Sequence, residues 1–392
     1  MILYVANMLL PEMGMASANR VKSLGRGLCE NGESVGIYIP FSDNGKKSEF
    51  KIGDIRCRAF FNSTRYRLLY ALTWRFMFPL KLIFAIGSSK DITCVIGYSY
   101  SVQLLCSLWL IAKLFHLPYY REVSEYPVYI IHPSRFNWFG IRKFLEKHIV
   151  PKLFDGMITM TRHVREFYQP LARRKCRFLR LPMTVDCARF VDKGEAPYDF
   201  PYIAYCGSMS CDRRGMINLV DAFSVISEEY PDLQLILIGN IDAAGKLEML
   251  KHVSSNAIKS KIIFTGTLPA CEVPRYICNA KILALIRPSN KQAEGGFPTK
   301  LGEYLATGVP TVVTRVGEID EFLTDRENIF FATPNSTESV ASCFYEILQN
   351  YNRASNIGQK GKVVANTYFN YFSAGKSLSE FLSSSVNFNK FS

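Results

Sequence analysis

The sequence has few of the residues that build metal sites and disulfides. Its 392 residues include only five histidines, all dispersed, and its eleven cysteines show neither a CxxC pair nor a cluster with histidine. Structural zinc sites need such clusters, and disulfide-rich secreted domains need paired cysteines in a short chain. The spacing therefore argues against a structural zinc site and predicts reduced thiols, as in a cytoplasmic protein.

The sequence also lacks a long apolar run that is free of charge. A helix that crosses a membrane needs about 20 predominantly apolar residues. The most apolar stretch, residues 65–88, is interrupted by Arg65, Arg67, Arg75 and Lys81. The first ten residues have no basic region before their apolar ones, which is typical of a first strand and not of a signal peptide. We expect no spanning helix. The stretch fits either an amphipathic segment at a membrane interface or a core helix whose arginines reach solvent.

Acidic residues are scarce in the first half of the chain. Residues 1–190 hold 28 Lys and Arg against 13 Asp and Glu, a net charge of +15, whereas the remainder holds 19 against 21. This excess indicates that the first half faces something anionic, such as a membrane or a nucleic acid, unless it is simply a soluble basic face. Nucleic-acid binding is the least favoured of these, because the pattern shows neither a recognition helix nor interleaved basic and aromatic residues on an open surface.

Short apolar runs alternate with amphipathic stretches along the chain. Residues 2–6 have the pattern of a buried strand, residues 19–29 that of a helix with one apolar face, and residues 35–39 that of the next strand. This is the opening βαβ unit of a doubly wound α/β sheet. A second such series starts at residues 202–206, after polar residues accumulate at 192–197. A chain of this length exceeds one ordinary core, so we expect two domains.

The most informative stretch is residues 295–310, which has the sequence G-G-F-P-T-K-L-G-E-Y-L-A-T-G-V-P. An apolar run at 282–286 precedes it and another at 311–313 follows it, and both are typical of buried parallel strands. Pro298 suits the first turn of a helix, and Gly308 suits its end. The order is therefore strand, glycine loop, helix and strand.

Such a loop has a chemical use. Glycines let the backbone approach a ligand closely, and the free N–H groups of a first helical turn point at an anion. Thr299 and Lys300 add a hydroxyl and an ammonium group at the same place, and Glu303 could accept hydrogen bonds from a diol such as a ribose. The combination suits a sugar nucleotide. Taken residue by residue, it also suits any helix that follows a buried strand.

The whole string resembles the donor-binding signature of family-four retaining glycosyltransferases, in a form common in bacterial surface-polysaccharide enzymes. Many of these enzymes carry a Glu, seven residues and a second Glu. Glu303 is the second, Gly295 stands where the first would be, and Glu294 is displaced by one position. Either an extra loop residue lets Glu294 reach the sugar, or the first Glu is absent. The resemblance implies a donor site that comprises Gly14, Arg213, Arg214, Glu294, Gly295, Gly296, Phe297, Thr299, Lys300, Leu301 and Glu303.

The turn at residues 207–215, with the sequence G-S-M-S-C-D-R-R-G, departs from the pattern of the family it resembles. Family members usually carry an arginine directly after the first glycine, where this chain has Ser208, and a basic residue before the second, which is Arg214 here. Neutralisation of the donor phosphates would then depend on Arg213 or Arg214 together with Lys300. The alternative for the arginine pair is a solvated loop charge.

Two carboxylates come at the end of the predicted strand near residues 119–123. Glu122 and Glu125 stand where the ligand edge of a parallel sheet is expected, which is a plausible position for acid–base chemistry. Family members often have a His or Asp near this position, so we predict a catalytic or acceptor-binding role for Glu125. The alternative for Glu122 is an ion pair with Arg121 or another arginine.

Together these features predict a GT-B glycosyltransferase of two Rossmann-like domains that face each other across a cleft. We place an acceptor domain at residues 1–188 and a donor domain at 189–368, with a helix in 369–392 packing back on the first.

The implied reaction is metal-free, because no Asp-x-Asp motif is present. It moves a sugar with retention from a nucleotide sugar to a lipid-linked glycan, with Lys300, Arg214 and Glu125 as catalytic residues and no cofactor. We expect a cytoplasmic enzyme, peripheral at the inner face of the membrane. A GT-B sugar-nucleotide epimerase is the alternative.

Overall fold

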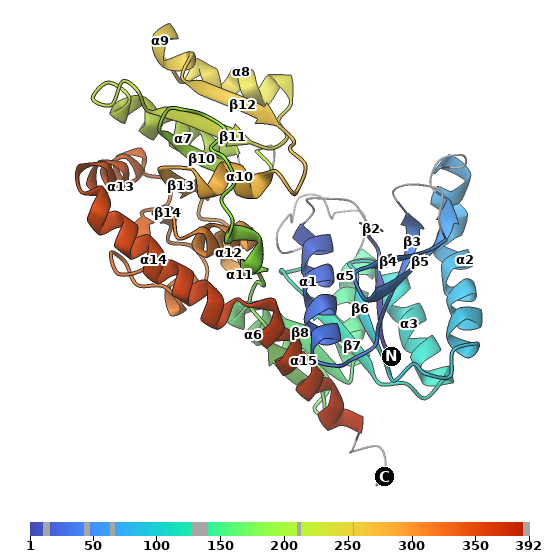
Figure 1. Cartoon of the computed structure of the whole chain (residues 1–392). Helices are drawn as coiled ribbons and strands as arrows, with labels where there is room; N and C mark the ends of the chain where they lie inside the picture. The colour runs from blue at the N-terminus through green and yellow to red at the C-terminus, as the bar shows by residue number, and fades with distance from the viewer. Residues whose placement is uncertain are drawn as a thin grey trace. The chain divides into compact units, whose positions relative to one another are not determined.

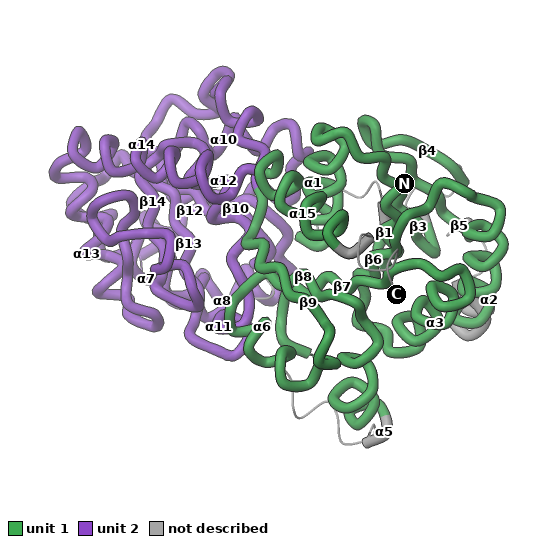
Figure 2. The backbone as a smooth tube through the Cα atoms, turned by 90° about the horizontal axis from the view of Figure 1, so that it is seen from below, with its two compact units in different colours: residues 1–184, 371–392 green, residues 185–370 purple. Residues whose placement is uncertain are grey.

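The computed structural model describes most of the chain and divides it into two compact units. Unit 1 comprises residues 1–184 together with 371–392, and unit 2 comprises residues 185–370 (Figure 2). The chain thus passes from unit 1 to unit 2 between residues 184 and 185 and returns between residues 370 and 371. The sequence predicted these two crossings at 188/189 and 368/369. The residues described are 1–10, 16–42, 48–62, 67–127, 130, 140–209, 213–253 and 255–386.

Unit 1 is built on a largely parallel sheet with the strand order β4-β5-β3-β1-β6-β7-β8-β9, and β2 pairs with β3 (Figure 1). The one antiparallel pair among these strands is β4 with β5. The strand order reverses at β1, because β3 lies on one side of it and β6, the first strand of the other half of the sheet, lies on the other. The strands are β1 (Ile2–Ala6), β2 (Leu9–Leu10), β3 (Val35–Ser42), β4 (Glu49–Ile52), β5 (Ile55–Asn62), β6 (Cys94–Tyr98), β7 (Tyr119–Val123), β8 (Gly156–Thr159) and β9 (Arg177–Arg180).

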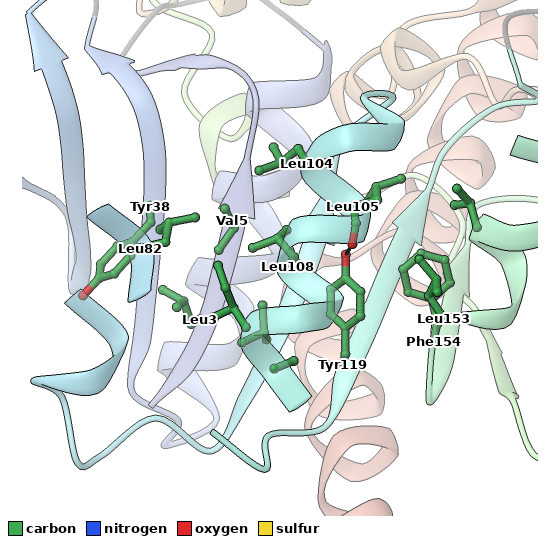
Figure 3. Close-up of a cluster of buried hydrophobic side chains, with 14 of the residues drawn as sticks. Leu3, Val5, Tyr38, Leu82, Leu104, Leu105, Leu108, Tyr119, Leu153 and Phe154 are labelled. Atoms are coloured by element: carbon green, nitrogen blue, oxygen red, sulfur yellow. Dashed lines mark hydrogen bonds between the residues drawn. The ribbon is translucent and has the colours of Figure 1, made fainter. Parts of the chain in front are cut away.

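Strand β1 shows how helices cover both faces of this sheet. Its side chains alternate, so that Leu3 and Val5 pack towards α2 and α3, while Ile2, Tyr4 and Ala6 pack towards α1 and α15. Figure 3 shows the first of these clusters. The helical elements are α1 (Ala16–Glu30), α2 (Arg67–Gly87), α3 (Val102–Leu114), α5 (Gly140–Phe144), η2 (Leu145–Ile149), η3 (Val150–Lys152), α6 (Arg162–Tyr168) and α15 (Tyr371–Val386).

Unit 2 has a parallel sheet with the order β12-β11-β10-β13-β14-β15. Its strands are β10 (Tyr202–Cys206), β11 (Gln234–Ile238), β12 (Ile262–Gly266), β13 (Ile282–Leu285), β14 (Thr311–Thr314) and β15 (Phe330–Ala332). Its helical elements are η4 (Cys187–Phe190), α7 (Arg213–Ile226), α8 (Ala243–Lys251), α9 (Asn256–Lys259), α10 (Val273–Cys278), α11 (Lys291–Gly295), α12 (Thr299–Thr307), η5 (Ile319–Glu321), α13 (Thr337–Gln349) and α14 (Tyr351–Tyr368).

Both sheets have the strand order of a doubly wound fold. In unit 2 the order of successive strands is 3-2-1-4-5-6, and unit 1 repeats it from β5 to β8. The prediction of two Rossmann-like domains is confirmed. In such sheets a ligand binds at the carboxyl ends of the strands, where the strand order reverses. That point lies between β1 and β6 in unit 1 and between β10 and β13 in unit 2.

Helix α2 occupies the apolar stretch that the sequence left open between an interface segment and a core helix. Its inner face is part of the core, through Phe78 and Leu82. Lys81, one of the basic residues that interrupt this stretch, is half-buried. Its ammonium group lies 4.4 Å from the centre of the Phe61 ring and donates to the carbonyl oxygen of Phe60 at 3.1 Å. Arg65 lies outside the described residues. Within the described ranges, no helix combines the length and apolar character needed to cross a membrane.

Helix α15 packs against α1 at a contact between two glycines. A Cβ atom on Gly375 would lie 2.2 Å from the carbonyl carbon of Gly27, and one on Gly27 would lie 2.2 Å from the carbonyl oxygen of Tyr371. Across the same contact, Asn31, just beyond α1, donates to the Phe372 carbonyl oxygen, and Glu30 of α1 accepts from the Tyr371 hydroxyl group. Helices α1 and α15 thus pack closer together at Gly27 and Gly375 than a residue with a Cβ atom would allow.

Gly375→Ala should destabilise the protein. The new methyl group meets backbone atoms that cannot rotate away, and overpacking of this kind costs about 1–3 kcal/mol. The cost should exceed the gain of about 1 kcal/mol that alanine brings in a helix. The measurement is urea unfolding, with Ser373→Ala on the exposed face of the same helix as the control. A variant as stable as the control would show that the contact is loose.

Candidate functional site

The predicted strand, glycine loop, helix and strand correspond to β13, α11, α12 and β14. Helix α12 begins after Pro298, which is its N-cap residue, and ends at Gly308, whose φ of 75° is left-handed and favours glycine. The predicted glycine loop is partly wrong, because residues up to Gly295 form the short helix α11. The side chain of Asn290 caps this helix by accepting from the Ala293 N–H, a signal that lies before the glycines.

Three charged side chains meet at the first turn of α12. The Lys300 ammonium group lies 2.9 Å from Oε2 of Glu303, and the Arg189 guanidinium group lies 3.8 Å from Oε1 of the same carboxylate. Arg189 also donates to the carbonyl oxygen of Ala270 at 2.9 Å. Glu303 is therefore held between two cations, one from its own helix and one from η4, and the cluster carries a net positive charge.

Burial works to lower the pKa of Lys300, but Glu303 and Cys206 outweigh it, and the pKa ends above its usual value. Lys300 is thus a stable cation at neutral pH. The Cys206 thiol lies at the end of β10, and burial raises its pKa although the Lys300 charge opposes that rise. The ammonium group therefore lies beside the carboxyl end of β10, which adjoins the reversal point of the sheet.

Tyr304 fixes this helix to the sheet. Its hydroxyl oxygen accepts from the Cys206 N–H at 2.6 Å, and the ring is fully buried. The neighbouring strand ends are joined by backbone bonds, since Gly207 donates to Ile238 and Gly239 donates to Gly266, both at 2.9 Å. A Cβ atom on Gly239 would lie 2.0 Å from the Gly207 oxygen. Backbone groups thus form much of the edge that faces the Lys300 cluster.

The structure brings some of the predicted donor residues together. Thr299, Lys300 and Glu303 lie on one turn of α12, while Leu301 and Phe297 are buried and contribute packing. Phe297 contacts the Phe322 and Phe369 rings. Gly295 and Gly296 are buried at the junction of α11 and α12.

Among the other predicted donor residues, Glu294 and Arg213 pair with side chains outside this cluster. Glu294 pairs with Lys291 of α11 at 2.7 Å. Arg213 pairs with Asp242 and Glu248 at 3.3 and 3.1 Å, and Arg214 beside it is exposed at the start of α7. Gly14 lies outside the described residues.

The two candidate carboxylates of unit 1 have different surroundings. Glu125 is half-buried just beyond the end of β7. Glu122 is fully buried and pairs with Arg20, which also donates to the carbonyl oxygens of Leu181 and Pro182. Burial raises the pKa of Glu122, and Arg20 opposes that rise. Glu122 therefore forms a structural ion pair, and its partner is Arg20 and not Arg121.

Arg189 is the residue of this cluster that sequence reasoning missed. The absence of the family's usual arginine at Ser208 left one positive charge of the resembled site unaccounted for. A search for another arginine near the domain boundary could have raised Arg189 as a candidate. Its closeness to Glu303 depends on the packing of η4 against α12, which no local pattern shows.

Tyr304→Phe should lower the free energy of unfolding by about 1–3 kcal/mol, because it leaves the buried Cys206 N–H without an acceptor. The ring stays, so packing changes little. Tyr345→Phe is the matched control. Its hydroxyl group is at the surface and donates to the Val225 carbonyl oxygen at 3.4 Å, so removal should change stability by less than about 0.5 kcal/mol. Urea unfolding measures both, and equal losses would contradict the role of Tyr304.

The part of the chain that contains Lys300 and Glu303 is similar to a known protein family. Residues 200–350 match the family model described as Glycosyl transferases group 1. A curated relative, the GDP-mannose-dependent alpha-(1-6)-phosphatidylinositol monomannoside mannosyltransferase of Mycolicibacterium smegmatis, is 24% identical over 243 residues. This match covers 58% of the present chain and 62% of the relative, which is less than two thirds of its length.

Solved structures resemble the chain over almost its whole length. Sucrose-phosphate synthase from Thermosynechococcus elongatus has a TM-score of 0.75 at 16% identity, and HepE of Anabaena in complex with UDP-glucose has a TM-score of 0.71 at 13% identity. Each comparison covers 98% of this chain and 99% of the other. Residues 200–350 thus resemble the Glycosyl transferases group 1 family, and the whole chain has the GT-B fold of two Rossmann-like domains.

Proposed function

We propose that the protein is a retaining glycosyltransferase. It moves a sugar from a nucleotide sugar to a lipid-linked glycan in cell-surface polysaccharide biosynthesis. The observation that carries this proposal is the cluster of Lys300, Glu303 and Arg189 at the first turn of α12. Lys300 and Glu303 lie within the residues that match the family, and the cluster lies at the carboxyl edge of the sheet, where ligands bind in doubly wound folds.

The chemistry of the cluster fits a donor with a diphosphate. Lys300 offers a stable positive charge, and the first N–H groups of α12 point the same way. Glu303 offers a carboxylate to sugar hydroxyl groups. The curated relative is named for GDP-mannose, and HepE was solved with UDP-glucose. Both ligands join a sugar to a nucleoside diphosphate, which supports this donor class without selecting the base.

The proposed reaction breaks the bond between the anomeric carbon and a diphosphate oxygen and forms a bond between that carbon and the acceptor's hydroxyl oxygen, which loses its proton. The leaving nucleoside diphosphate gains negative charge, which Lys300 and the N–H groups of the helix stabilise. Arg213 and Arg214 are the further proposed cations. The absence of an Asp-x-Asp motif supports a reaction that needs no metal. On the acceptor side, Glu125 is the proposed group that receives a hydrogen bond from the attacking hydroxyl group.

The proposed lipid-linked acceptor has support from the curated relative, whose name describes a phosphatidylinositol glycolipid as its acceptor. The outer faces of α2 and α3 add a structural argument, because large apolar side chains there face solvent. Phe76, Leu80 and Phe84 of α2 are 68%, 53% and 78% exposed, and Leu110 and Leu114 of α3 are 61% and 60% exposed. Apolar surface of this kind marks an interaction site.

The two faces are neighbours. Gln103 at the start of α3 donates to the Arg75 carbonyl oxygen, and Gly87 at the end of α2 lies against Phe115. Neither helix contains an aspartate or glutamate, and the exposed Arg75 and Lys113 add positive charge. An apolar face with cations and no acids suits an anionic bilayer. We therefore propose that the protein binds peripherally at the inner face of the cytoplasmic membrane.

Lys300→Ala should lower turnover about a hundredfold or more, as for loss of a donor that stabilises developing negative charge. Lys360→Ala, exposed on α14, is the control and should keep full turnover. A thermal-shift screen of nucleotide sugars selects the donor first, because ligand binding raises apparent stability. Products are then compared with and without a glycan acceptor. Full turnover in a folded Lys300→Ala variant would exclude this role, and conversion of the donor without an acceptor would indicate an epimerase.

The double variant Phe76→Ser and Phe84→Ser should bind anionic vesicles at least tenfold more weakly than the wild type, because each buried phenylalanine contributes about 1.5–3 kcal/mol. Binding of the wild type should weaken as salt rises. Sedimentation with phosphatidylglycerol-containing and neutral vesicles measures this. Val363→Ser, exposed on α14 in unit 2, is the control. Equal pelleting with both kinds of vesicle, or unchanged pelleting of the double variant, would contradict the proposal.

A further inference from the structure

A cavity lies at the amino edge of the unit 2 sheet, opposite the edge that carries the Lys300 cluster. Ala280, just before β13, and Pro310, just before β14, line it together with Thr307 and Gly308 at the end of α12. Along α12, Thr307 is seven positions beyond Lys300, which is about 10 Å of helix. The cavity is therefore separate from the candidate donor site.

The cavity has the size of a small organic ligand. Its volume is about 190 Å³, and it is partly open to solvent. A dry internal cavity of about 150 Å³ is enough to hold a benzene ring. The cavity in unit 2 thus has room for one six-membered sugar ring, whose substituents can extend through the open side.

Helix α14 supplies a row of polar side chains to this cavity. Tyr351, Ser355 and Gln359 line it and follow one another at intervals of four residues, so they share one face of the helix and lie about 6 Å apart along its axis. Hydroxyl and amide groups both donate and accept hydrogen bonds. A small ion reaches only one of these side chains, whereas hydroxyl groups spread over a sugar ring can bind two neighbouring ones.

Two lysines lie at this cavity without an acid partner. Lys193 lines it, and Asn279 holds the Lys193 backbone by donating to its carbonyl oxygen at 3.0 Å. The Lys281 ammonium group lies 3.4 Å from the centre of the Tyr351 ring, and burial lowers the pKa of this lysine. Within the part of the chain that the structure describes, neither lysine forms an ion pair.

The Cys278 thiol in the cavity wall has further charges near it. Burial raises the pKa of this thiol, Lys193 and Lys362 oppose the rise, and Asp192 adds to it. The Asp192 carboxylate already accepts from the backbone N–H two residues further on, at 2.9 Å. With Lys281, three lysines thus stand against one aspartate, which favours a ligand that carries negative charge.

We propose that this cavity binds a sugar unit that carries an acidic group, at a site separate from the donor site. Lys193 pairs with the acidic group, and the hydroxyl groups of Tyr351 and Ser355 bind hydroxyl groups of the sugar ring. A uronic acid in a glycan and a soluble sugar phosphate share this chemistry. The inference goes beyond the proposed glycosyl transfer, because it needs neither Lys300 nor a bound donor.

The test is calorimetric titration of the full chain with glucuronic acid, glucose 6-phosphate and glucose. We expect both acidic sugars to bind about tenfold more tightly than glucose and to bind more weakly as salt rises. Lys193→Met should weaken both acidic sugars about tenfold, because a hydrogen bond to a charged group is lost. Lys251→Met, at an exposed lysine of α8, is the control and should change neither affinity.

A variant that fills the cavity tests where the sugar binds. Ser355→Tyr places a phenol ring in the cavity and should abolish binding, whereas Asn356→Tyr, at an exposed position of the same helix, should leave it unchanged. Lys300→Ala weakens the candidate donor site and should also leave binding unchanged.

Three outcomes would overturn the proposal: none of the sugars binds, binding survives in a folded Ser355→Tyr variant, or Lys300→Ala removes it. If Ser355→Tyr does not fold, the exposed Lys193 decides, and unchanged affinity of both acidic sugars in Lys193→Met overturns the proposal equally.

The two acidic sugars also separate the sources of the ligand. Tighter binding of glucuronic acid assigns the site to an acidic glycan, and tighter binding of glucose 6-phosphate assigns it to a soluble sugar phosphate. Both results support the site. The titration needs no turnover, so a protein that binds these sugars without transferring one keeps the site, and an active transferase that binds none of them loses this site alone.

Discussion

The hydrogen bond between the Tyr304 hydroxyl group and the Cys206 backbone joins the helix of the candidate donor site to the end of the central strand of unit 2. Because this strand end is next to the reversal point of the sheet, the bond sets where Lys300 and Glu303 lie. The far end of α12 is held as tightly. A Cβ atom on Gly358 of α14 would lie 2.4 Å from the Gly308 oxygen. Both ends of the helix are thus fixed, so its charged first turn is preorganised for a ligand.

Charged side chains have different surroundings in the core of unit 1 and at the candidate donor site of unit 2. Glu122 and Arg121 are adjacent on β7, so their side chains point to opposite faces of the sheet. On the α1 side, Glu122 meets Arg20 and is neutralised. On the other side, Arg121 meets aromatic rings and a cavity wall. Both charged groups are thus buried in unit 1, the carboxylate beside a cation and the guanidinium group against aromatic rings. In unit 2, the cluster of Lys300, Glu303 and Arg189 has two cations against one carboxylate and keeps an excess of positive charge.

Unit 1 has large apolar side chains at its surface as well as in its core. Helices α2 and α3 pack Phe78, Leu82 and Leu108 into the core, yet their outer faces carry further large apolar side chains. A helix that is apolar all round is normally buried on all sides. In a cell this surface would need a cover, and an acid-free pair of helices favours anionic lipid over a second basic protein surface.

The sequence by itself determined the elements and their order. Short apolar runs such as residues 282–286 predicted parallel strands, and the string from Gly295 to Pro310 located the donor helix, because periodicity and glycine or proline signals act over a few neighbouring residues. Only the tertiary structure decided which charges meet. Arg189 lies 114 positions before Glu303, Arg20 lies 102 before Glu122, and Lys81 contacts the ring of Phe61, 20 positions before it. These pairings depend on how helices pack over a sheet, and residues distant in sequence carry no local signal of that packing.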